Sequence, residues 1–308
     1  YTDKEKNAVN AEWSMRREMD FFGQYKLARN MMGSHPANRF LIGNLETLGD
    51  KADSKLHPET VAFYNQYYSA NIMKAVLLSN LPLAEMEQLA VKHFANIENK
   101  QIDKPDVSAK LDFSQLAGKR IHYVPNNDVK QLRLDFTISN NSEQFAVKPN
   151  EFITYLLGSE MPGTPASQLK ALGLISNLNA SATPDLYGNY GSLSIDIDLT
   201  DAGMQNREGI VATIMQYIDL VKQQGVDSKY FSEIQTSLNN QFRFLEKGDE
   251  FGYVANLADA MQKVPARNAI NAPFYYQRFE AKAVQDVLAQ LTPQRLRVWY
   301  ISKQEPHD

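Results

Sequence analysis

The sequence predicts an α+β protein built from two-layer α/β units, with helices on one face of a mixed, largely antiparallel sheet. Residues 131–138 and 192–199 alternate strictly between apolar and polar side chains, which is typical of strands with one buried face. Elsewhere apolar residues recur every three or four positions, as on one face of a helix. A helix followed by a strand-like run occurs twice, which indicates one partial and one complete copy of the same unit.

The composition favours a globular protein of about two domains, since 308 residues with 43% hydrophobic and 22% charged side chains can bury a sizeable core. A net charge of −4 argues against nucleic acid as a partner, because phosphate binding needs clustered Lys and Arg. The longest apolar stretch, near residues 72–83, is too short to span a bilayer. The chain has no cysteine, which excludes disulfides and thiolate ligands.

The first third of the chain is predicted to be mainly helical. Four apolar residues from Phe21 to Met32 form a stripe on one face, and we expect a helix across residues 4–32 with Gly33 at its C-terminal cap. The remaining elements of this part are helices over 58–68 and 82–94, a strand over 72–79 between them, and a polar linker over 98–112.

Beyond the linker, the chain alternates between strands and helices. The two alternating strands are joined by helical stretches and by an apolar segment at 174–182, and a last strand is predicted over 295–302. Helices are expected over residues 147–157, 164–172, 227–247, 250–263 and 280–291, and along a stripe of Ile210, Ile214, Ile218 and Val221.

The two copies are related by an offset of 223 residues, which aligns Ser69 with Thr292. Each of these residues lies in a polar turn between a helix and a strand-like run of the same length. We therefore predict that residues 1–97 are the closing half of one unit and that residues 113–308 are a complete second unit. The front of the first unit is expected to lie before Tyr1.

The residues that could perform catalysis are sparse. The five histidines are scattered as His35, His57, His93, His122 and His307, so neither HExxH nor HxxEH is present. Asp196 and Asp198 are spaced like a carboxylate pair, but on an alternating strand this spacing is more typical of a solvated face.

Glu5 and Glu12 lie seven residues apart, which places both carboxylates on the same side of a helix, with the small Ala8 between them. From this spacing alone, two surface charges are the more common interpretation, and a metal site is the alternative.

Longer segments of the chain resemble the pitrilysin and insulin-degrading enzyme family of zinc peptidases, the inverzincins, and most of all its bacterial pitrilysin (protease III) members. The similar segments occur in the same order along nearly the whole chain: KEKNAVNAE at 4–12, GNLETL at 43–48, YYSANIMKAVLLSN at 67–80, IHYVP at 121–125, ITYLLG at 153–158, PGT at 162–164 and WYISKQEPH at 299–307. The resemblance implies a processing-peptidase-like metallohydrolase fold and a parent enzyme that is a zinc-dependent endopeptidase degrading peptides and small unfolded proteins.

The resemblance also implies roles for the two glutamates. Glu12 matches the third zinc ligand of the family, and Glu5 matches a glutamate that supports the site without binding the metal. The HxxEH motif that supplies the other ligands and the general base would lie upstream of Tyr1. We therefore expect Zn²⁺ in the parent enzyme, and we expect this chain alone to lack it and to be inactive.

In the second domain, the resemblance implies a sheet-edge site that holds the substrate through backbone pairing. It matches Gly158, Glu160, Leu178, Asn179 and Ala180, although the family has glycines at the positions of Ala180 and Ser181 and a histidine at that of Ser159. The alternative is an ordinary buried strand next to an acidic helix end.

The partners implied by the resemblance are a peptide or small-protein substrate, the missing N-terminal segment and the C-terminal half of the same enzyme. Neither nucleic acid nor a membrane span is expected. The bacterial members imply a periplasmic location, which the lack of cysteine permits. The alternative function is a non-catalytic peptide-binding or scaffold subunit of the same superfamily, which would lack HxxEH upstream.

Overall fold

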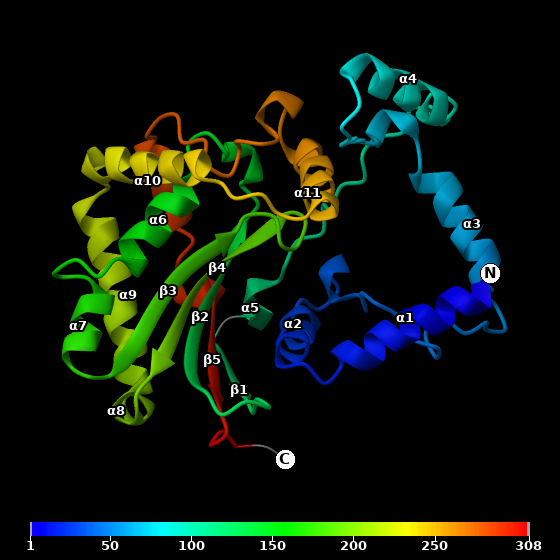
Figure 1. Cartoon of the computed structure of the whole chain (residues 1–308). Helices are drawn as coiled ribbons and strands as arrows, with labels where there is room; N and C mark the ends of the chain where they lie inside the picture. Colours follow the sequence, from blue (N-terminus) through cyan, green and yellow to red (C-terminus); the bar gives the residue numbers. More distant parts are fainter. Residues whose placement is uncertain (1, 117, 307–308) are drawn as a thin grey trace. The chain divides into compact units, whose positions relative to one another are not determined.

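The computed structural model describes residues 2–116 and 118–306 and has the α+β architecture that the sequence predicts (Figure 1). The chain forms two compact units, each assembled from three separate stretches. Unit 1 consists of Tyr1–Arg17, Phe40–Asp106 and Phe242–Pro273. Unit 2 consists of Glu18–Arg39, Val107–Gln241 and Phe274–Asp308.

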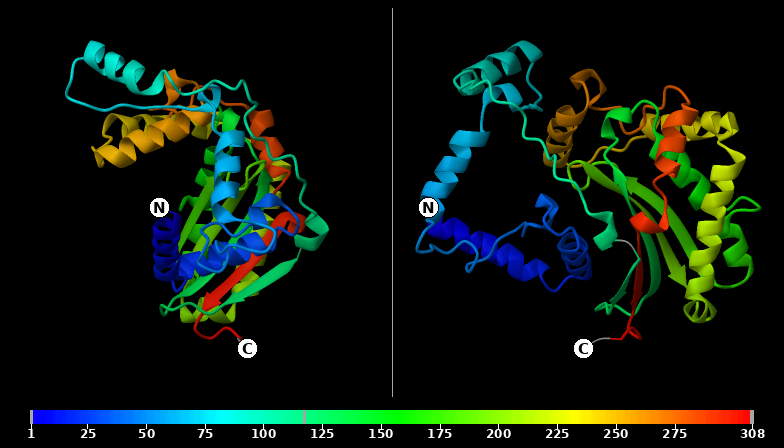
Figure 2. Two further views of the ribbon diagram at one scale, coloured as in Figure 1. Left: turned by 90° about the vertical axis from the view of Figure 1, so that its right-hand side faces the viewer. Right: turned by 180° about the vertical axis from the view of Figure 1, so that it is seen from behind.

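Unit 2 contains a five-stranded mixed sheet with the strand order β1-β5-β2-β4-β3. Its strands are β1 (Lys119–Tyr123), β2 (Lys130–Ser139), β3 (Ile175–Thr183), β4 (Tyr190–Leu199) and β5 (Leu296–Ser302). β1 pairs with β5 in parallel, and the other pairings are antiparallel. β1 and β3 therefore form the two edges of the sheet, and the views agree that the strands form one twisted layer (Figure 2).

The predicted alternation of β2 and β4 determines which face of the sheet is buried. In their pairing register, Leu134 faces Ile195 and Phe136 faces Leu193, and all four side chains are buried in the main core. A shift of one residue would turn every one of these side chains to the opposite face. The apolar pattern therefore determines the pairing as well as the strands themselves.

Helices complete the main core on that face. α9 (Arg207–Gln224) buries Ile210, Ile214 and Ile218 against the sheet, as its stripe predicts. The other helices of unit 2 are α2 (Asp20–Asn30), α5 (Phe113–Leu116), α6 (Pro149–Gly158), α7 (Pro165–Ala171), α8 (Asp201–Gln205), α10 (Phe231–Arg243, which runs two residues past the unit boundary) and α12 (Ala281–Leu288).

The opposite face of the sheet packs against α2. Ala28 of this helix lies in a small cluster with Ile121, Trp299 and Ile301 from β1 and β5. Beneath it, Arg297 of β5 pairs with Asp135 of β2, and both side chains are buried. This face of the sheet therefore combines a small apolar contact with a buried ion pair.

Unit 1 is mainly helical, with α1 (Thr2–Arg16), α3 (Leu56–Tyr67), α4 (Leu83–Phe94) and α11 (Glu250–Lys263). The strand predicted over residues 72–79 is wrong. Residues 70–72 form a short 3-10 helix, and residues 73–79 run on as plain coil before α4 (Figure 2). Within the described residues, no strand pairs with this segment, and a β-strand exists only with a partner to accept its hydrogen bonds.

The two segments that the offset relates share their local geometry. Ser69 precedes a 3-10 helix at Ala70–Ile72, and Thr292 precedes one at Pro293–Arg295. After Pro293–Arg295 the chain continues into β5, which has β1 and β2 on either side. The difference between the two segments is therefore the presence of neighbouring strands, since their local patterns are alike.

The single helix predicted across residues 4–32 is also wrong, because the chain forms two helices with a break at residues 17–19. The carboxylate of Asp20, at the start of α2, accepts a bifurcated hydrogen bond from the backbone N–H of Asn126, whose nitrogen lies 2.8 Å from Oδ1 and 3.0 Å from Oδ2. The Asn126 side chain donates to the Glu18 carbonyl at 2.6 Å. These contacts with the loop after β1 favour a new helix start over continuation of the first helix.

Candidate functional site

The strongest candidate for a binding site is the free edge of β3, which has β4 on one side and no strand on the other among the described residues. An exposed edge presents unpaired backbone N–H and C=O groups, to which an extended peptide can add as a further strand. Three of the five predicted substrate-binding residues, Leu178, Asn179 and Ala180, lie on this strand.

The structure brings a fourth predicted residue to the same place. Gly158 ends α6, and a Cβ atom added to it would lie 3.5 Å from the backbone nitrogen of Ala180 and 3.6 Å from its Cβ. Residues 22 positions apart in the sequence thus meet where the helix passes the strand. α6 and α7 both pack against β3, so the edge lies beside a helical layer (Figure 1).

The fifth predicted residue, Glu160, lies just after α6 and forms an ion pair with Lys170 of α7, with 2.5 Å between Nζ and Oε1. The glutamate side chain is 61% exposed and that of the lysine 31%. Such an exposed pair contributes little to stability. Glu160 is therefore available to a ligand, but any cation that binds it competes with Lys170.

The ionisable groups near the strand are suited to binding more than to acid–base catalysis. Burial raises the pKa of Tyr155 on α6 to about 12, with a further contribution from Glu233, so its phenol stays protonated at neutral pH. Burial lowers the pKa of Lys148 to about 8, but this residue precedes the opposite end of α6 from Gly158.

The candidate zinc residues lie in unit 1, on α1. Glu5 and Glu12 are both exposed on this helix, two turns apart, as their spacing predicts. No group of three His, Asp or Glu side chains that could hold a metal ion occurs within residues 2–116 and 118–306, and His307 lies outside them. A catalytic zinc needs three protein ligands, so the described residues do not complete a zinc site.

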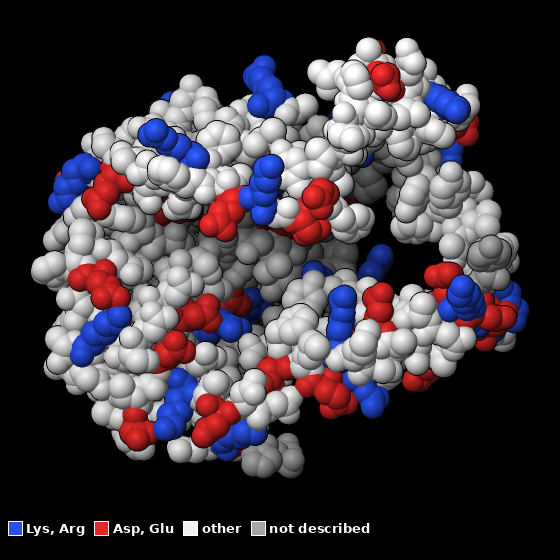
Figure 3. Space-filling model, in the orientation of Figure 1, with Lys and Arg blue, Asp and Glu red and all other residues white. Residues whose placement is uncertain are grey.

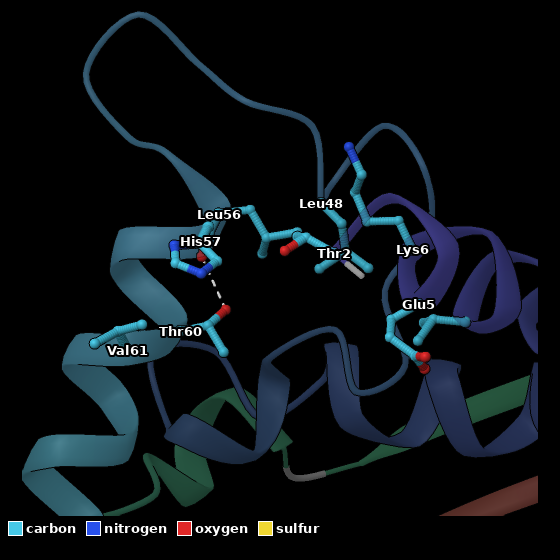
Figure 4. Close-up of a pocket in the computed structure, with 9 residues that line it drawn as sticks. Thr2, Glu5, Lys6, Leu48, Leu56, His57, Thr60 and Val61 are labelled. Atoms are coloured by element: carbon cyan, nitrogen blue, oxygen red, sulfur yellow. Dashed lines mark hydrogen bonds between the residues drawn. The ribbon is translucent and has the colours of Figure 1, made fainter.

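Glu5 lines a cavity of about 320 Å³ between α1 and α3 (Figure 4). α1 contributes Thr2, Glu5, Lys6 and Val9, α3 contributes Leu56, His57, Thr60 and Val61, and Leu48 comes from the loop between them. The Thr60 hydroxyl donates to the Leu56 carbonyl at 2.8 Å, which occupies it within its own helix. The sequence did not indicate that His57 lines the same cavity as Glu5, because the two residues lie 52 positions apart.

Two further side chains beside the β3 edge were not predicted as site residues. Lys170 carries no signal in the sequence except its position in the last turn of α7. Asp198 of β4 accepts hydrogen bonds from Gln131 at 3.0 Å and from Asn177 of β3 at 3.5 Å. The spacing of Asp196 and Asp198 predicted a solvated face, and both residues are indeed partly exposed on the same face of β4.

The visible surface carries basic and acidic side chains side by side, without a large area of one sign on the face shown (Figure 3). No helix within the described residues is long and apolar enough to cross a membrane.

Comparison with known proteins identifies the family. Residues 59–238 match the family model described as the peptidase M16 inactive domain, and residues 242–308 match the one described as the middle or third domain of peptidase M16. The chain therefore belongs to the peptidase M16 family, which confirms the resemblance inferred from its sequence.

Individual relatives agree with this assignment. Protease 3 of Escherichia coli is 40% identical over the whole chain, and the insulin-degrading enzyme of Drosophila melanogaster is 28% identical over 98% of it. The chain spans about a third of the length of these relatives, 32% and 31% respectively. The crystal structure of pitrilysin superimposes on the whole chain with a TM-score of 0.96 at 40% identity, and the chain covers 33% of it. The predicted fold class is thereby confirmed.

Proposed function

We propose that this chain is part of a zinc-dependent endopeptidase that degrades peptides and small unfolded proteins, and that its own role is to hold the substrate. The main observation in support of this proposal is that Gly158 lies close to Ala180 at the free edge of β3. Because Gly158 at the end of α6 has no side chain, it does not obstruct another backbone that pairs with the edge of β3. Membership of the peptidase M16 family and similarity to Protease 3 support the parent activity.

Within this proposal, Glu12 supplies one zinc ligand in the parent enzyme and Glu5 supports the site. Carboxylates such as that of Glu12 are common zinc ligands. Glu12 is exposed on α1, so it can bind a zinc ion together with other ligands that lie outside the described residues. Residues 1–97 belong to the catalytic domain, residues 98–112 form the linker, and residues 113–308 form the second domain. The parent enzyme is periplasmic, by analogy with bacterial pitrilysins.

A second candidate is a non-catalytic peptide-binding or scaffold subunit. It is favoured by the match of residues 59–238 to a domain described as inactive, and by the incomplete set of metal ligands within the described residues. In this case the β3 edge would still hold peptides, while Glu12 would have no metal to bind.

The substrate-holding role is tested with Glu160→Gln in the full-length protein. We expect the KM for long peptides to rise about threefold or more and that for short peptides to change little, because only long peptides reach β3. Glu280→Gln is the matched control, since Glu280 also forms an exposed ion pair, with Arg278. Equal effects on long and short peptides would contradict the proposal.

The zinc assignment is tested separately on the 308-residue chain. We expect no zinc-dependent peptide cleavage and only weak zinc binding by calorimetry, because one carboxylate does not hold the ion tightly. In the full-length protein, Glu12→Gln should lower the zinc content. Zinc-dependent cleavage by the 308-residue chain would refute the proposed division of the ligands.

A further inference from the structure

The two faces of β3 differ in polarity along its free edge. Leu178, Ala180 and Ala182 point to the helical side, where Leu178 is buried and the two alanines pack against the main core. The residues between them point to the other side and are exposed, namely Asn177, Asn179, Ser181 and Thr183. The edge therefore has an apolar side and a polar side.

A peptide strand added to β3 would continue this division. Side chains directly opposite each other on neighbouring strands lie about 4.5–5.5 Å apart, so those on the helical side would meet Leu178, Ala180 or Ala182. The side chains of Ala180 and Ala182 are small, and Gly158, which lies close to Ala180, adds no side chain on this side of the strand. A shift of one residue in the pairing between the peptide and β3 would move every side chain of the peptide to the opposite face. The binding of a peptide therefore depends on the order of its residues as well as on its composition.

The polar side also carries a negative charge without a cationic partner. Asp196 pairs with Arg133, and Asp201 with Lys130, both at 2.5 Å. The carboxylate of Asp198, in contrast, has only its hydrogen bonds from Gln131 and Asn177 within the described residues. An added strand would lie about 10 Å from β4, which is two strand spacings. The flexible stem of a lysine on this strand can cross that distance over Asn177.

We infer that the β3 edge selects extended peptide segments in which apolar and polar side chains alternate, with a lysine or arginine on the polar side near Asp198. This inference rests on the proposed function, because it describes which substrates the proposed peptide-binding edge accepts. The alternation of β3, the small residues Ala180 and Gly158, and the Asp198 carboxylate, which has no cationic partner within residues 2–116 and 118–306, all point to the same class of peptide.

The test uses the 308-residue chain and two synthetic peptides of identical composition. In one peptide, apolar residues alternate with polar residues that include one lysine, and in the other the apolar residues form one block. Binding is measured by fluorescence anisotropy and is located by hydrogen exchange of residues 175–183. We expect the alternating peptide to bind about tenfold more tightly and to protect β3 from exchange.

Asp198→Asn provides the test of charge. It should weaken binding of the lysine-containing alternating peptide about threefold and leave a norleucine version unchanged, whereas Asp286→Asn on α12 should affect neither. If both peptides protect β3 equally, the edge binds peptides but the selectivity is refuted. If neither peptide protects β3, the proposed function of the edge fails together with the inference.

Discussion

At the scale of single residues, the most constrained group is the buried pair of Arg297 and Asp135 in the middle of the sheet. Their side chains are 1% and 8% exposed. Asp135 also accepts hydrogen bonds from Ser192 and, at 3.1 Å, from Ser194, while Arg297 donates to the Ala28 carbonyl at 3.3 Å. Burial disfavours the charged guanidinium, but Asp135 and Tyr187 together outweigh that effect and raise the pKa of Arg297. The pair therefore links β2, β4, β5 and α2 through one network.

Replacing Arg297 with methionine should lower the free energy of unfolding by about 3–5 kcal/mol, because it leaves the Asp135 carboxylate buried without its cation. Urea unfolding monitored by the fluorescence of the buried Trp299 measures the change. Lys282→Met, which breaks the exposed pair with Asp286, should cost less than about 1 kcal/mol. If the two variants lose similar amounts of unfolding free energy, the buried network of Arg297 and Asp135 contributes no more to stability than an exposed ion pair.

Glu305 forms a second buried cluster at the end of β5. His122 lies 2.6 Å and Ser302 2.9 Å from its carboxylate, and Arg207 also pairs with it. Burial raises the pKa of this carboxyl, but the hydrogen bonds from these three side chains together lower the pKa by more than burial raises it. The pKa of Glu305 therefore lies below its ordinary value.

A carboxyl with a lower pKa in the folded than in the unfolded chain contributes stability above its unfolded pKa, which is about 4.3. This contribution is lost as the pH falls through the folded pKa. We therefore expect Glu305→Gln to be destabilised near neutral pH and to lose less further stability than the parent chain between about pH 5 and pH 3. Urea titrations across this range measure the slopes, and the exposed Glu143→Gln should keep the parent slope.

At the scale of elements, the contrast between β5 and residues 73–79 shows what a strand requires. Both segments follow a helix and a 3-10 turn, but only β5 lies between two partner strands. Residues 73–79 have exposed apolar side chains, including Leu77 and Leu78. These side chains have no neighbouring strand to cover them within the described residues.

Hydrogen exchange of the 308-residue chain should distinguish these segments. We expect the amides of residues 74–80 to exchange rapidly, because no backbone hydrogen bond protects them within the described residues. The amides of residues 132–138 in the centre of the sheet should exchange slowest. Comparable protection in the two segments would show that residues 74–80 have a partner after all.

At the scale of the whole molecule, apolar burial is distributed unevenly between the units. All three clusters of buried apolar residues belong to unit 2. Within the described part of unit 1, the buried apolar residues are only Ala269 and Ala272, whereas many large apolar side chains of this unit are exposed. Since apolar burial is the main favourable contribution to folding, unit 2 should be the more stable unit.

Limited proteolysis of the 308-residue chain should therefore begin in unit 1. We expect trypsin to cut first at exposed basic residues such as Lys92 and Lys247, and to leave residues 119–241 intact for longer. Mass spectrometry of the early fragments identifies the sites. First cuts within the sheet of unit 2 would show that the distribution of apolar burial does not govern local stability.

The sequence by itself determined the α+β class, the strands β2, β4 and β5, most of the helices and the family, because periodicity and local motifs are properties of neighbouring residues. It did not determine whether residues 73–79 pair with another strand. Nor did it determine the break between α1 and α2, which Asn126 stabilises by its hydrogen bond to Asp20. Both features depend on contacts between residues far apart in the sequence. The resemblance suggested Gly158 and Ala180 as site residues, but only the tertiary structure placed them together and left β3 at an edge. Backbone pairing and packing join residues far apart in the chain, and no local pattern records which ones will meet.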